Sequence, residues 1–321
     1  ALAIVPEGSG LLIETEVFDD GFPSPPGEST LTWSVLQAPA GGSVLFSPPQ
    51  GLSTVANFNV PGIYKILVTA DDGVNTGTAE LSVNAGVVAG SNPSEENEIV
   101  YFNFEERAGN TATDIRGGDN NGILGGAMNW TGIEFGISGS GLVFDGVDDQ
   151  VNIPISPDIN LQDHSLRSIV LWFKAEDPLK KTKQVLYEEG GGTRGFNIYL
   201  EDGLLYVGGW NNGANSWEET YLSTDITDTE WHHAALVLNA QVSTDLQPDA
   251  FKGYLDGLEF GSGGAATLDP HNGAIAIGAV NGATQFHDGN SSGATGRFTG
   301  IIDEFHLWNR ALTPGEIGQL F

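Results

Sequence analysis

The chain has 321 residues, a length typical of two domains. It carries 42 Asp and Glu residues against 12 Lys and Arg residues, for a formal net charge of −30, and it contains no Cys. Such a charge repels nucleic-acid phosphates and anionic lipid surfaces, so neither is an expected partner. A chain without Cys has no disulfides, thiolate metal sites or Cys nucleophiles. No apolar stretch reaches the roughly 18 residues that a membrane span needs, so we expect no membrane insertion.

Residues 1–86 carry short alternating runs separated by turn residues such as Pro25-Pro26-Gly27 and Asp72-Gly73. The runs that we expect to form strands are Leu11–Phe18, Leu31–Leu36, Val55–Phe58, Tyr64–Ala70 and Ala79–Val83. Strands at this spacing are typical of an antiparallel sandwich.

Residues 87–98 (VVAGSNPSEENE) are small, polar and acidic, which indicates a linker. The N-terminus at Ala1 has neither an initiator Met nor the basic residues of a signal peptide. We therefore expect the chain to be a piece of a longer secreted or cell-surface protein, with other domains of that parent among its partners.

Residues 99–321 again predict many strands and one short helix at the end. The expected strands are Ile99–Phe104, Gly141–Phe144, Gln150–Ile153, Ser168–Lys174, Lys183–Tyr187, Gly195–Glu201, Leu204–Trp210, His232–Leu238, Phe251–Leu255, Ala274–Ile277 and Gly300–Trp308. No fixed 40-residue period is present, so two stacked sheets are favoured over a propeller. Thr313 is the expected N-cap of a helical turn over Ile317–Phe321.

The second unit resembles the laminin-G-like, concanavalin A-like jelly roll of bacterial secreted proteins. The segments that carry the resemblance are Tyr101–Glu105, Asp114–Gly117, Asn120–Gly122, Leu142–Asp149, Trp231–Leu236, Tyr254–Gly257 and Gly300–Leu312. The resemblance covers nearly all of 99–321 and implies a fold that accommodates many ligands.

The first unit resembles a PKD-type or cadherin-like immunoglobulin domain. This resemblance rests on Asp19–Pro23, Leu31–Trp33, Pro61–Tyr64 and Thr69–Gly73. The fold class that we predict is all-β: an immunoglobulin-like β-sandwich over 1–86, followed by a concanavalin A-like jelly-roll β-sandwich over 99–321. Families that combine these modules are usually spacers and binders.

Calcium is the expected cofactor, in a structural role, because Ca²⁺ takes carboxylate, amide and carbonyl oxygens in glycine-rich loops. The loop at 114–122 offers Asp114, Asp119 and Asn121. Asp303 shares a strand face with apolar residues and needs a partner, and the family fold brings its strand beside this loop. The alternative is an Asp303 that accepts hydrogen bonds from turn amides without a metal.

Two further acidic groups are weaker metal candidates. In the first unit, Asp19 and Asp71 end different strands and offer a second calcium site, or they are exposed turn acids. The group of Asp145, Asp148 and Asp149 is interpreted as a hairpin turn with solvated acids.

Carbohydrate binding needs an aromatic face and planar polar groups, and the stretch from Tyr187 to Trp217 supplies both. The candidate ligand-binding residues are Tyr187, Arg194, Asn197, Trp210, Asn211 and Trp217. The alternative is that one of these Trp residues fills the end of the sandwich. The basic cluster of Lys180, Lys181 and Lys183 is either solvated or a grip for an anionic saccharide.

Catalytic patterns are missing from the sequence. Jelly-roll glucanases place Glu-x-Asp-x-x-Glu on one strand, and this chain has no such string. Glu188 and Glu189 are adjacent and therefore point to opposite faces of a strand.

The sequence thus predicts a non-catalytic, calcium-stabilised binding or adhesion fragment that recognises a polysaccharide or glycoconjugate. A spacer or protein-interaction module without a glycan ligand is the alternative, and a polysaccharide-active enzyme is the weakest option. The acidic composition favours an extracellular location on a bacterium of marine or halophilic origin.

Overall fold

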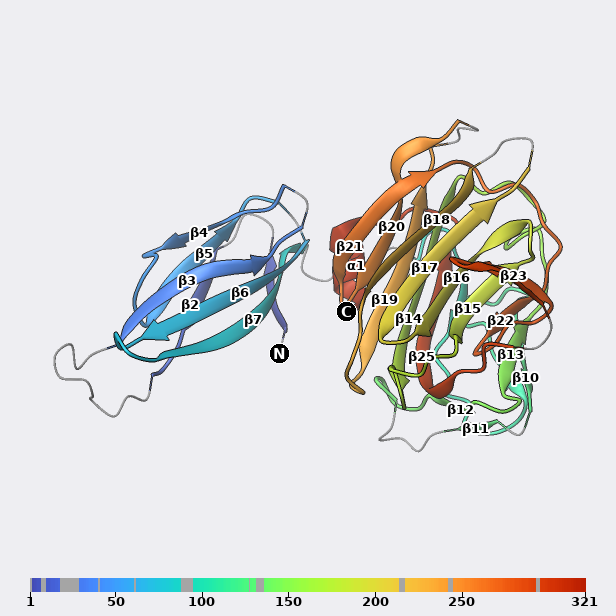
Figure 1. Cartoon of the computed structure of the whole chain (residues 1–321), viewed down its shortest axis with the longest axis horizontal. Helices are drawn as coiled ribbons and strands as arrows, with labels where there is room; N and C mark the ends of the chain where they lie inside the picture. Colours follow the sequence, from blue (N-terminus) through green and yellow to red (C-terminus); the bar gives the residue numbers. More distant parts are fainter. Residues whose placement is uncertain are drawn as a thin grey trace. The chain divides into compact units, whose positions relative to one another are not determined.

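The structure is a computed structural model, and it describes residues 2–6, 10–17, 29–39, 41–60, 62–87, 95–126, 128–130, 136–213, 217–241, 245–292 and 295–321. Contacts divide the chain into two compact units (Figure 1). The first comprises Ala1–Ser94 together with Thr313–Phe321, and the second comprises Glu95–Leu312. The C-terminal segment therefore groups with the first unit, whereas the sequence analysis assigned it to the second.

The described residues of the first unit form two sheets and one helix. One sheet has the order β1 (Leu2–Pro6), β7 (Thr76–Val87), β6 (Gly62–Asp71) and β3 (Thr30–Gln37). The other has the order β2 (Leu11–Glu14), β5 (Ser53–Phe58) and β4 (Val44–Ser47). Trp33 and Tyr64 are buried in its core, and the Tyr64 hydroxyl donates to the carbonyl oxygen of Val60 at 2.7 Å.

The helix α1 (Pro314–Leu320) contacts β6 and β7. Thr313 caps it as the sequence predicts: its side chain accepts from the amide of Glu316, while the Glu316 carboxylate accepts from the amide of Thr313. This reciprocal pair is the capping box, which satisfies two backbone donors at the helix start.

The second unit is a sandwich of two large sheets (Figure 1). The first, called the front sheet, has the order β18 (Glu218–Asp225), β17 (Leu204–Asn211), β16 (Arg194–Glu201), β15 (Gln184–Gly190), β22 (Ile275–Ile277), β13 (Gln150–Ile153), β10 (Gly122–Gly125) and β9 (Thr111–Ala112). The second, called the back sheet, has the order β11 (Asn129–Trp130), β12 (Leu142–Asp145), β25 (Thr299–Trp308), β14 (Leu166–Ala175), β19 (His232–Asn239), β20 (Gln247–Leu255) and β21 (Leu258–Ala265). β8 (Glu98–Phe102) pairs with the end of β25, and β23 (Ala283–Phe286) forms a hairpin with β24 (Gly289–Ser292).

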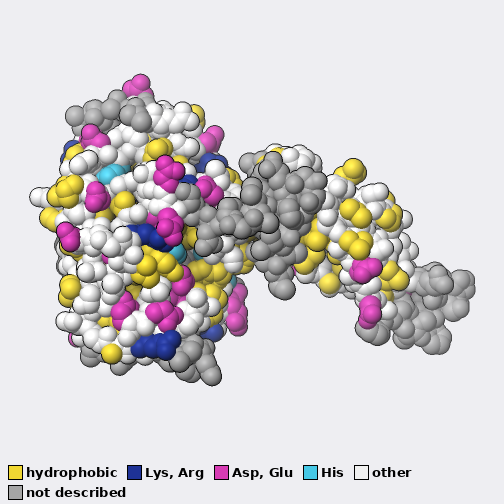
Figure 2. All heavy atoms as spheres, turned by 180° about the vertical axis from the view of Figure 1, so that it is seen from behind, with side chains coloured by type: hydrophobic (Ala, Val, Ile, Leu, Met, Phe, Trp, Pro, Cys, Tyr) yellow, Lys and Arg dark blue, Asp and Glu magenta, His cyan; other side chains and the backbone are white. Residues whose placement is uncertain are grey.

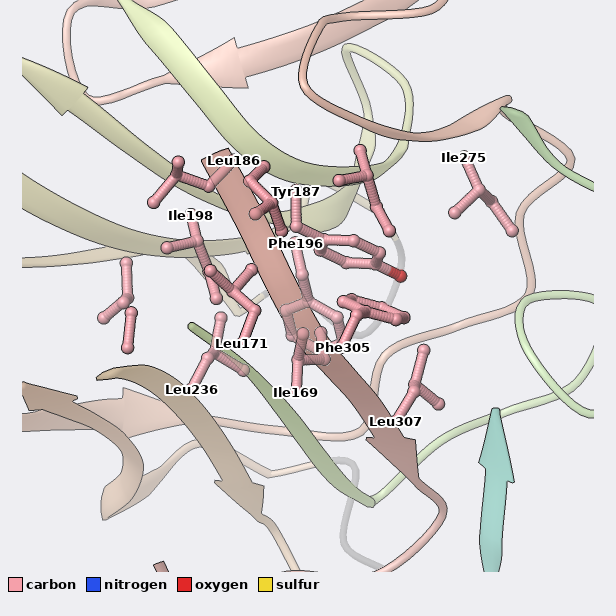
Figure 3. Close-up of a cluster of buried hydrophobic side chains, with 14 of the residues drawn as sticks. Ile169, Leu171, Leu186, Tyr187, Phe196, Ile198, Leu236, Ile275, Phe305 and Leu307 are labelled. Carbon is pink, nitrogen blue, oxygen red and sulfur yellow. The ribbon is translucent and has the colours of Figure 1, made fainter. Parts of the chain in front are cut away.

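Apolar side chains of the two sheets meet in one continuous core. Figure 3 shows Leu186 and Ile198 of the front sheet near Leu171 and Leu236 of the back sheet. The ring of Tyr187 stacks on Phe305, with ring centroids 5.3 Å apart. Alternation along the strands places every second side chain in this core, as the sequence pattern predicts.

Acidic side chains are spread over the visible face of the larger unit, with few basic ones among them (Figure 2). Within the described residues, no helix has the length and apolar character needed to cross a membrane.

Candidate functional site

A surface pocket of about 440 Å³ lies in the second unit beside the end of the β15–β16 hairpin. Its lining includes Leu161, Gly191, Arg194, Pro270, His271 and Asn272. These residues come from three segments that are far apart in sequence: the loop before β14, the β15–β16 hairpin, and the segment between β21 and β22.

Close backbone contacts and one buried side chain, that of Asn160, hold these segments together. Gly273 lies so close to Gly190 that a Cβ at position 273 would overlap the carbonyl oxygen of Gly190. Asn160 is fully buried. Its side-chain amide donates to the carbonyl oxygen of Gly273 at 3.2 Å, and its main-chain carbonyl oxygen accepts from the backbone amide of His271 at 2.8 Å. Glycine is therefore required where the two walls of the pocket meet.

Arg194 stands in the pocket wall in a fixed orientation. Its Nε donates to the side-chain oxygen of Asn211 at 2.9 Å, its Nη1 donates to the carbonyl oxygen of Pro270 at 3.3 Å, and its Nη2 lies 3.4 Å from Asp269. The side chain is 30% exposed. A guanidinium has five N–H donors in its plane, so N–H groups remain available to a ligand after these three contacts.

A charged network is buried behind the pocket. Glu189 is fully buried, accepts a hydrogen bond from the Tyr187 hydroxyl at 2.8 Å, and lies 3.9 Å from His271 Nε2. Arg167 of β14 is also fully buried and donates to the carbonyl oxygen of Ile159. Burial opposes the ionisation of Glu189, but the charge of Arg167, followed by His271, outweighs it and lowers the pKa of Glu189.

Several atoms of this network have no hydrogen-bond partner among the described residues. They are Nε and Nη1 of Arg167, Oε1 of Glu189, and both ring nitrogens of His271. Buried polar atoms are nearly always hydrogen-bonded, to water where protein groups are missing. His271 lines the pocket with 6% of its side chain exposed, while its ring nitrogens are buried and Nε2 lies 3.9 Å from the Glu189 carboxylate.

His164 lies on the other side of the network, in a second pocket of about 400 Å³ that Asp158 and Asp163 also line. Burial, and next the charge of Arg167, lower the pKa of His164 to about 3. Its ring is therefore neutral at neutral pH.

The structure corrects the prediction of an aromatic platform. Trp210 is fully buried, with its Nε1 donating to the carbonyl oxygen of Gly191 at 2.8 Å. Trp217 is 2% exposed, packs on Phe196 and Phe251, and donates to Thr220. Neither indole presents a face to a sugar, because β17 continues through Trp210 and Trp217 closes the core.

The other predicted ligand residues divide into two groups. Arg194 is in the pocket, and Asn211 holds Arg194 from behind while donating to Thr267. Tyr187 belongs to the core and the buried network. Asn197 is fully buried elsewhere, where its amide donates to the carbonyl oxygen of Gln285 at 2.7 Å and so holds the β23 strand.

Among the predicted calcium residues of the second unit, Asp114 and Asn121 lie side by side, and Asp114 Oδ2 is buried without a hydrogen-bond partner among the described residues. The calcium site itself stays a prediction. Asp114 accepts from the amides of Tyr101 and Arg116, Asp119 is exposed, and Asn121 accepts from the amide of Asp114. Asp303 is fully buried and accepts from the amides of Ser138 and Glu304 at 3.1 and 2.8 Å. Burial raises the pKa of Asp303 to about 7.

The separation of Asp303 from the Asp114 loop follows from strand register. Asp303 lies opposite Trp172 of β14, whereas Tyr101, whose amide contacts Asp114, lies opposite His306 of β25. Asp303 therefore lies at one position along β25, and the Asp114 carboxylate lies beside another, the one paired with Tyr101.

In the first unit, Asp71 accepts from the amide of Gly73 at 2.8 Å and is exposed, as a turn acid. Asp19 lies outside the described residues. The pairing of these two carboxylates therefore stays a prediction.

The basic cluster is only partly solvated. The ammonium group of Lys183 lies 2.7 Å from Asp288 and 3.1 Å from Glu201. Burial alone would lower the pKa of Lys183, but these two carboxylates outweigh burial and raise it. Lys183 is thus already neutralised within the protein, whereas Lys181 is exposed.

Sequence reasoning did not identify His271, Glu189 and Arg167 as one site. His271 was a lone histidine, and Arg167 begins an apolar strand in which an interior charge is unexpected. Arg167, at the start of an otherwise apolar strand, is the one feature of the sequence that indicates a buried acidic partner.

The comparisons with known proteins agree with this architecture. A laminin-G-like family model, described as the concanavalin A-like lectin/glucanases superfamily, matches residues 145–318. Human neuronal pentraxin-1 is 33% identical over 96 residues, which make up 30% of this chain and 20% of that protein.

Solved structures show the same fold at low identity. The binding domain of Paraclostridial Mosquitocidal Protein 1 has a TM-score of 0.53 at 15% identity, and the receptor binding domain of botulinum neurotoxin D has a TM-score of 0.52 at 12% identity. In each case the match covers 70% of this chain and 52% of that chain, so this chain spans about half of their length. Because the family model matches more than half of the sequence, the chain belongs to the concanavalin A-like lectin/glucanase superfamily.

Proposed function

We propose that this protein is a non-catalytic binding and adhesion fragment of an extracellular protein, and that its second unit binds carbohydrate in the pocket beside Arg194 and His271. The observation that carries the proposal is the pocket in which the oriented, 30% exposed guanidinium of Arg194 and the imidazole of His271 lie together. A binding pocket with a few convergent polar groups is the usual form of a small-ligand site.

The chemistry of the pocket suits a saccharide. The imidazole of His271 carries two ring nitrogens that can take part in hydrogen bonds, and a sugar hydroxyl can both donate and accept. Arg194 adds donors, and Leu161 and Pro270 add apolar surface for the C–H face of a sugar ring. The recognition that we propose is therefore mainly polar, without a stacked Trp.

The comparisons support a binding role. The similar solved chains carry the titles of a binding domain and a receptor binding domain. Polysaccharide hydrolysis needs two facing carboxylates, whereas Glu188 accepts from the amide of Asn281 and Glu189 belongs to the network with Tyr187.

For the first unit we propose an immunoglobulin-like spacer of the PKD or cadherin type. The support is its pair of sheets and the bond from the Tyr64 hydroxyl to the carbonyl four residues earlier, which resembles the tyrosine corner of such domains.

A glycan array probed with the intact chain tests the carbohydrate proposal. We expect binding to one class of saccharide, weakened by about tenfold or more in Arg194→Ala and His271→Ala. Lys181→Ala is the control, because Lys181 is exposed in the alternative basic cluster. An array without any ligand would refute carbohydrate binding. Loss of binding in Lys181→Ala alone would place the site elsewhere.

A further inference from the structure

Three carboxylates gather at the turn between β12 and β13. Asp145, Asp148 and Asp149 each offer an oxygen, and these oxygens lie within 4.8 Å of one another. Asp145 and Asp148 are exposed, but Asp149 is 3% exposed. The expectation of three solvated acids is therefore wrong for Asp149.

The carboxylate of Asp149 is only half satisfied. Its Oδ2 accepts from the amide of Asp145 at 3.0 Å, whereas its Oδ1 is buried and has no hydrogen-bond partner among the residues that the structure describes. A buried, ionised carboxylate without a partner is costly unless a cation or hydrogen-bond donors compensate it.

The nearest basic side chain does not fill this role. Arg297 donates from Nη1 to the carbonyl oxygens of Asp148 and Asp149, both at 3.1 Å, and to the side-chain oxygen of Gln150 at 3.0 Å. Within the described ranges, no Lys, Arg or His forms an ion pair with Asp145, Asp148 or Asp149.

A second cluster shows what a satisfied group of this kind looks like. Glu201, His287 and Asp288 also offer three closely spaced ligand atoms. There, the ammonium group of Lys183 contacts both carboxylates at 2.7–3.1 Å and supplies the positive charge. The group at Asp149 lacks such an ammonium group.

We infer that Asp145, Asp148 and Asp149 bind a hard divalent cation of the calcium class. All three side chains offer oxygen, which favours Ca²⁺ over metals that prefer nitrogen or sulfur. Asp145 Oδ1 accepts from the amide of Val147 at 2.7 Å, which leaves its Oδ2 for the cation. One oxygen each of Asp148 and Asp149, together with water, would complete the coordination.

The surrounding backbone is compatible with this site. Gly126 has a φ of +75°, and a Cβ at this position would lie 2.6 Å from Asp149 Oδ1. A side chain at position 126 would therefore collide with this oxygen, and glycine avoids the collision.

Calorimetric titration of the intact chain with Ca²⁺ tests the inference, with Tb³⁺ luminescence as a second readout. We expect a dissociation constant of about 10⁻⁴ to 10⁻³ M, the range of extracellular calcium modules. Asp148→Asn and Asp149→Asn should weaken binding by about tenfold or more. Ca²⁺ should also raise the melting temperature of the wild type but not of Asp148→Asn.

Asp119→Asn is the matched control, since it removes the same charge from the exposed loop that the sequence analysis favoured. It should bind Ca²⁺ like the wild type. Circular dichroism in EDTA checks that each variant is folded. A wild type that binds no Ca²⁺ at millimolar concentration would overturn the inference, and so would loss of binding in Asp119→Asn with retention in Asp148→Asn.

Discussion

The indole Nε1 of Trp210 donates a hydrogen bond of 2.8 Å to the carbonyl oxygen of Gly191. Trp210 is fully buried, and Gly191 lines the pocket. A residue that the sequence predicts to touch the ligand thus supports the loop that forms the pocket instead.

Trp210→Phe should therefore reduce ligand binding without removing a ligand contact. The carbonyl of Gly191 loses its donor, at a cost of about 1 kcal/mol in the free energy of unfolding. The smaller phenyl ring also leaves a cavity, whose cost the control variant below shares. We expect a weaker affinity for the saccharide identified on the array. Trp217→Phe is the control, because its Nε1 bonds to Thr220 instead of the pocket loop. Equal losses of affinity in the two variants would contradict the role assigned to Trp210.

Glu189→Gln and Glu188→Gln should differ greatly in stability. Removal of the Glu189 charge leaves Arg167 buried without its ionic partner, which costs about 3–5 kcal/mol. Burial raises the pKa of Glu188 well above its ordinary value, so Glu188→Gln removes a charge that the fold disfavours, and we expect a smaller loss of stability there. Urea denaturation at pH 7 measures both, and similar values for the two variants would refute this difference.

The buried Asp303 should make stability depend on pH. An unfolded Asp ionises near pH 3.9, whereas burial raises the pKa of Asp303 to about 7 in the folded state, so the folded state holds the proton more tightly between these values. The stabilisation from this proton is fully present below about pH 4 and is lost as the pH rises through about 7. The free energy of unfolding should fall by about 4 kcal/mol over this range.

Asp303→Asn removes this titration. The difference in unfolding free energy between wild type and variant should therefore change between pH 4 and pH 8, in favour of the wild type at the acidic end. A difference that is constant across this range would show that Asp303 ionises normally in the fold.

Removal of residues 313–321 should affect the first unit, because α1 contacts β6 and β7. In a chain ending at Leu312, hydrogen exchange should accelerate in these two strands and stay unchanged in the back sheet of the second unit. Thr313→Ala should have a smaller effect of about 1 kcal/mol through loss of the cap. Faster hydrogen exchange in the second unit alone would show that α1 stabilises that unit and not β6 and β7.

Much of the fold was predictable because alternation and turn residues determine strands locally. The expected strand Gln150–Ile153 is β13 residue for residue, and Leu204–Trp210 is β17 without its last residue. β18 was missed because Glu218–Asp225 is mostly polar, and β21 was missed because Leu258–Ala265 is rich in glycine.

The candidate site was less predictable, because it depends on contacts between distant segments. The sequence Trp210–Gly213 is typical of a turn, yet β17 continues to Asn211 and buries the indole. The pairing of β25 with β8 and β14 separates Asp303 from Asp114, and sequence alone does not specify that register. Similarly, only the folded chain brings His271 beside Glu189.

The most direct test of the proposed pocket is the ¹⁵N NMR spectrum of the histidine rings during titration with the saccharide identified on the array. His271 lines the pocket, so its ring resonances should shift as the ligand binds. His232, held between Asp228 and Asp256 away from the pocket lining, is the control in the same spectrum and should not move. Saturable binding that leaves the His271 ring nitrogens unchanged would contradict the account.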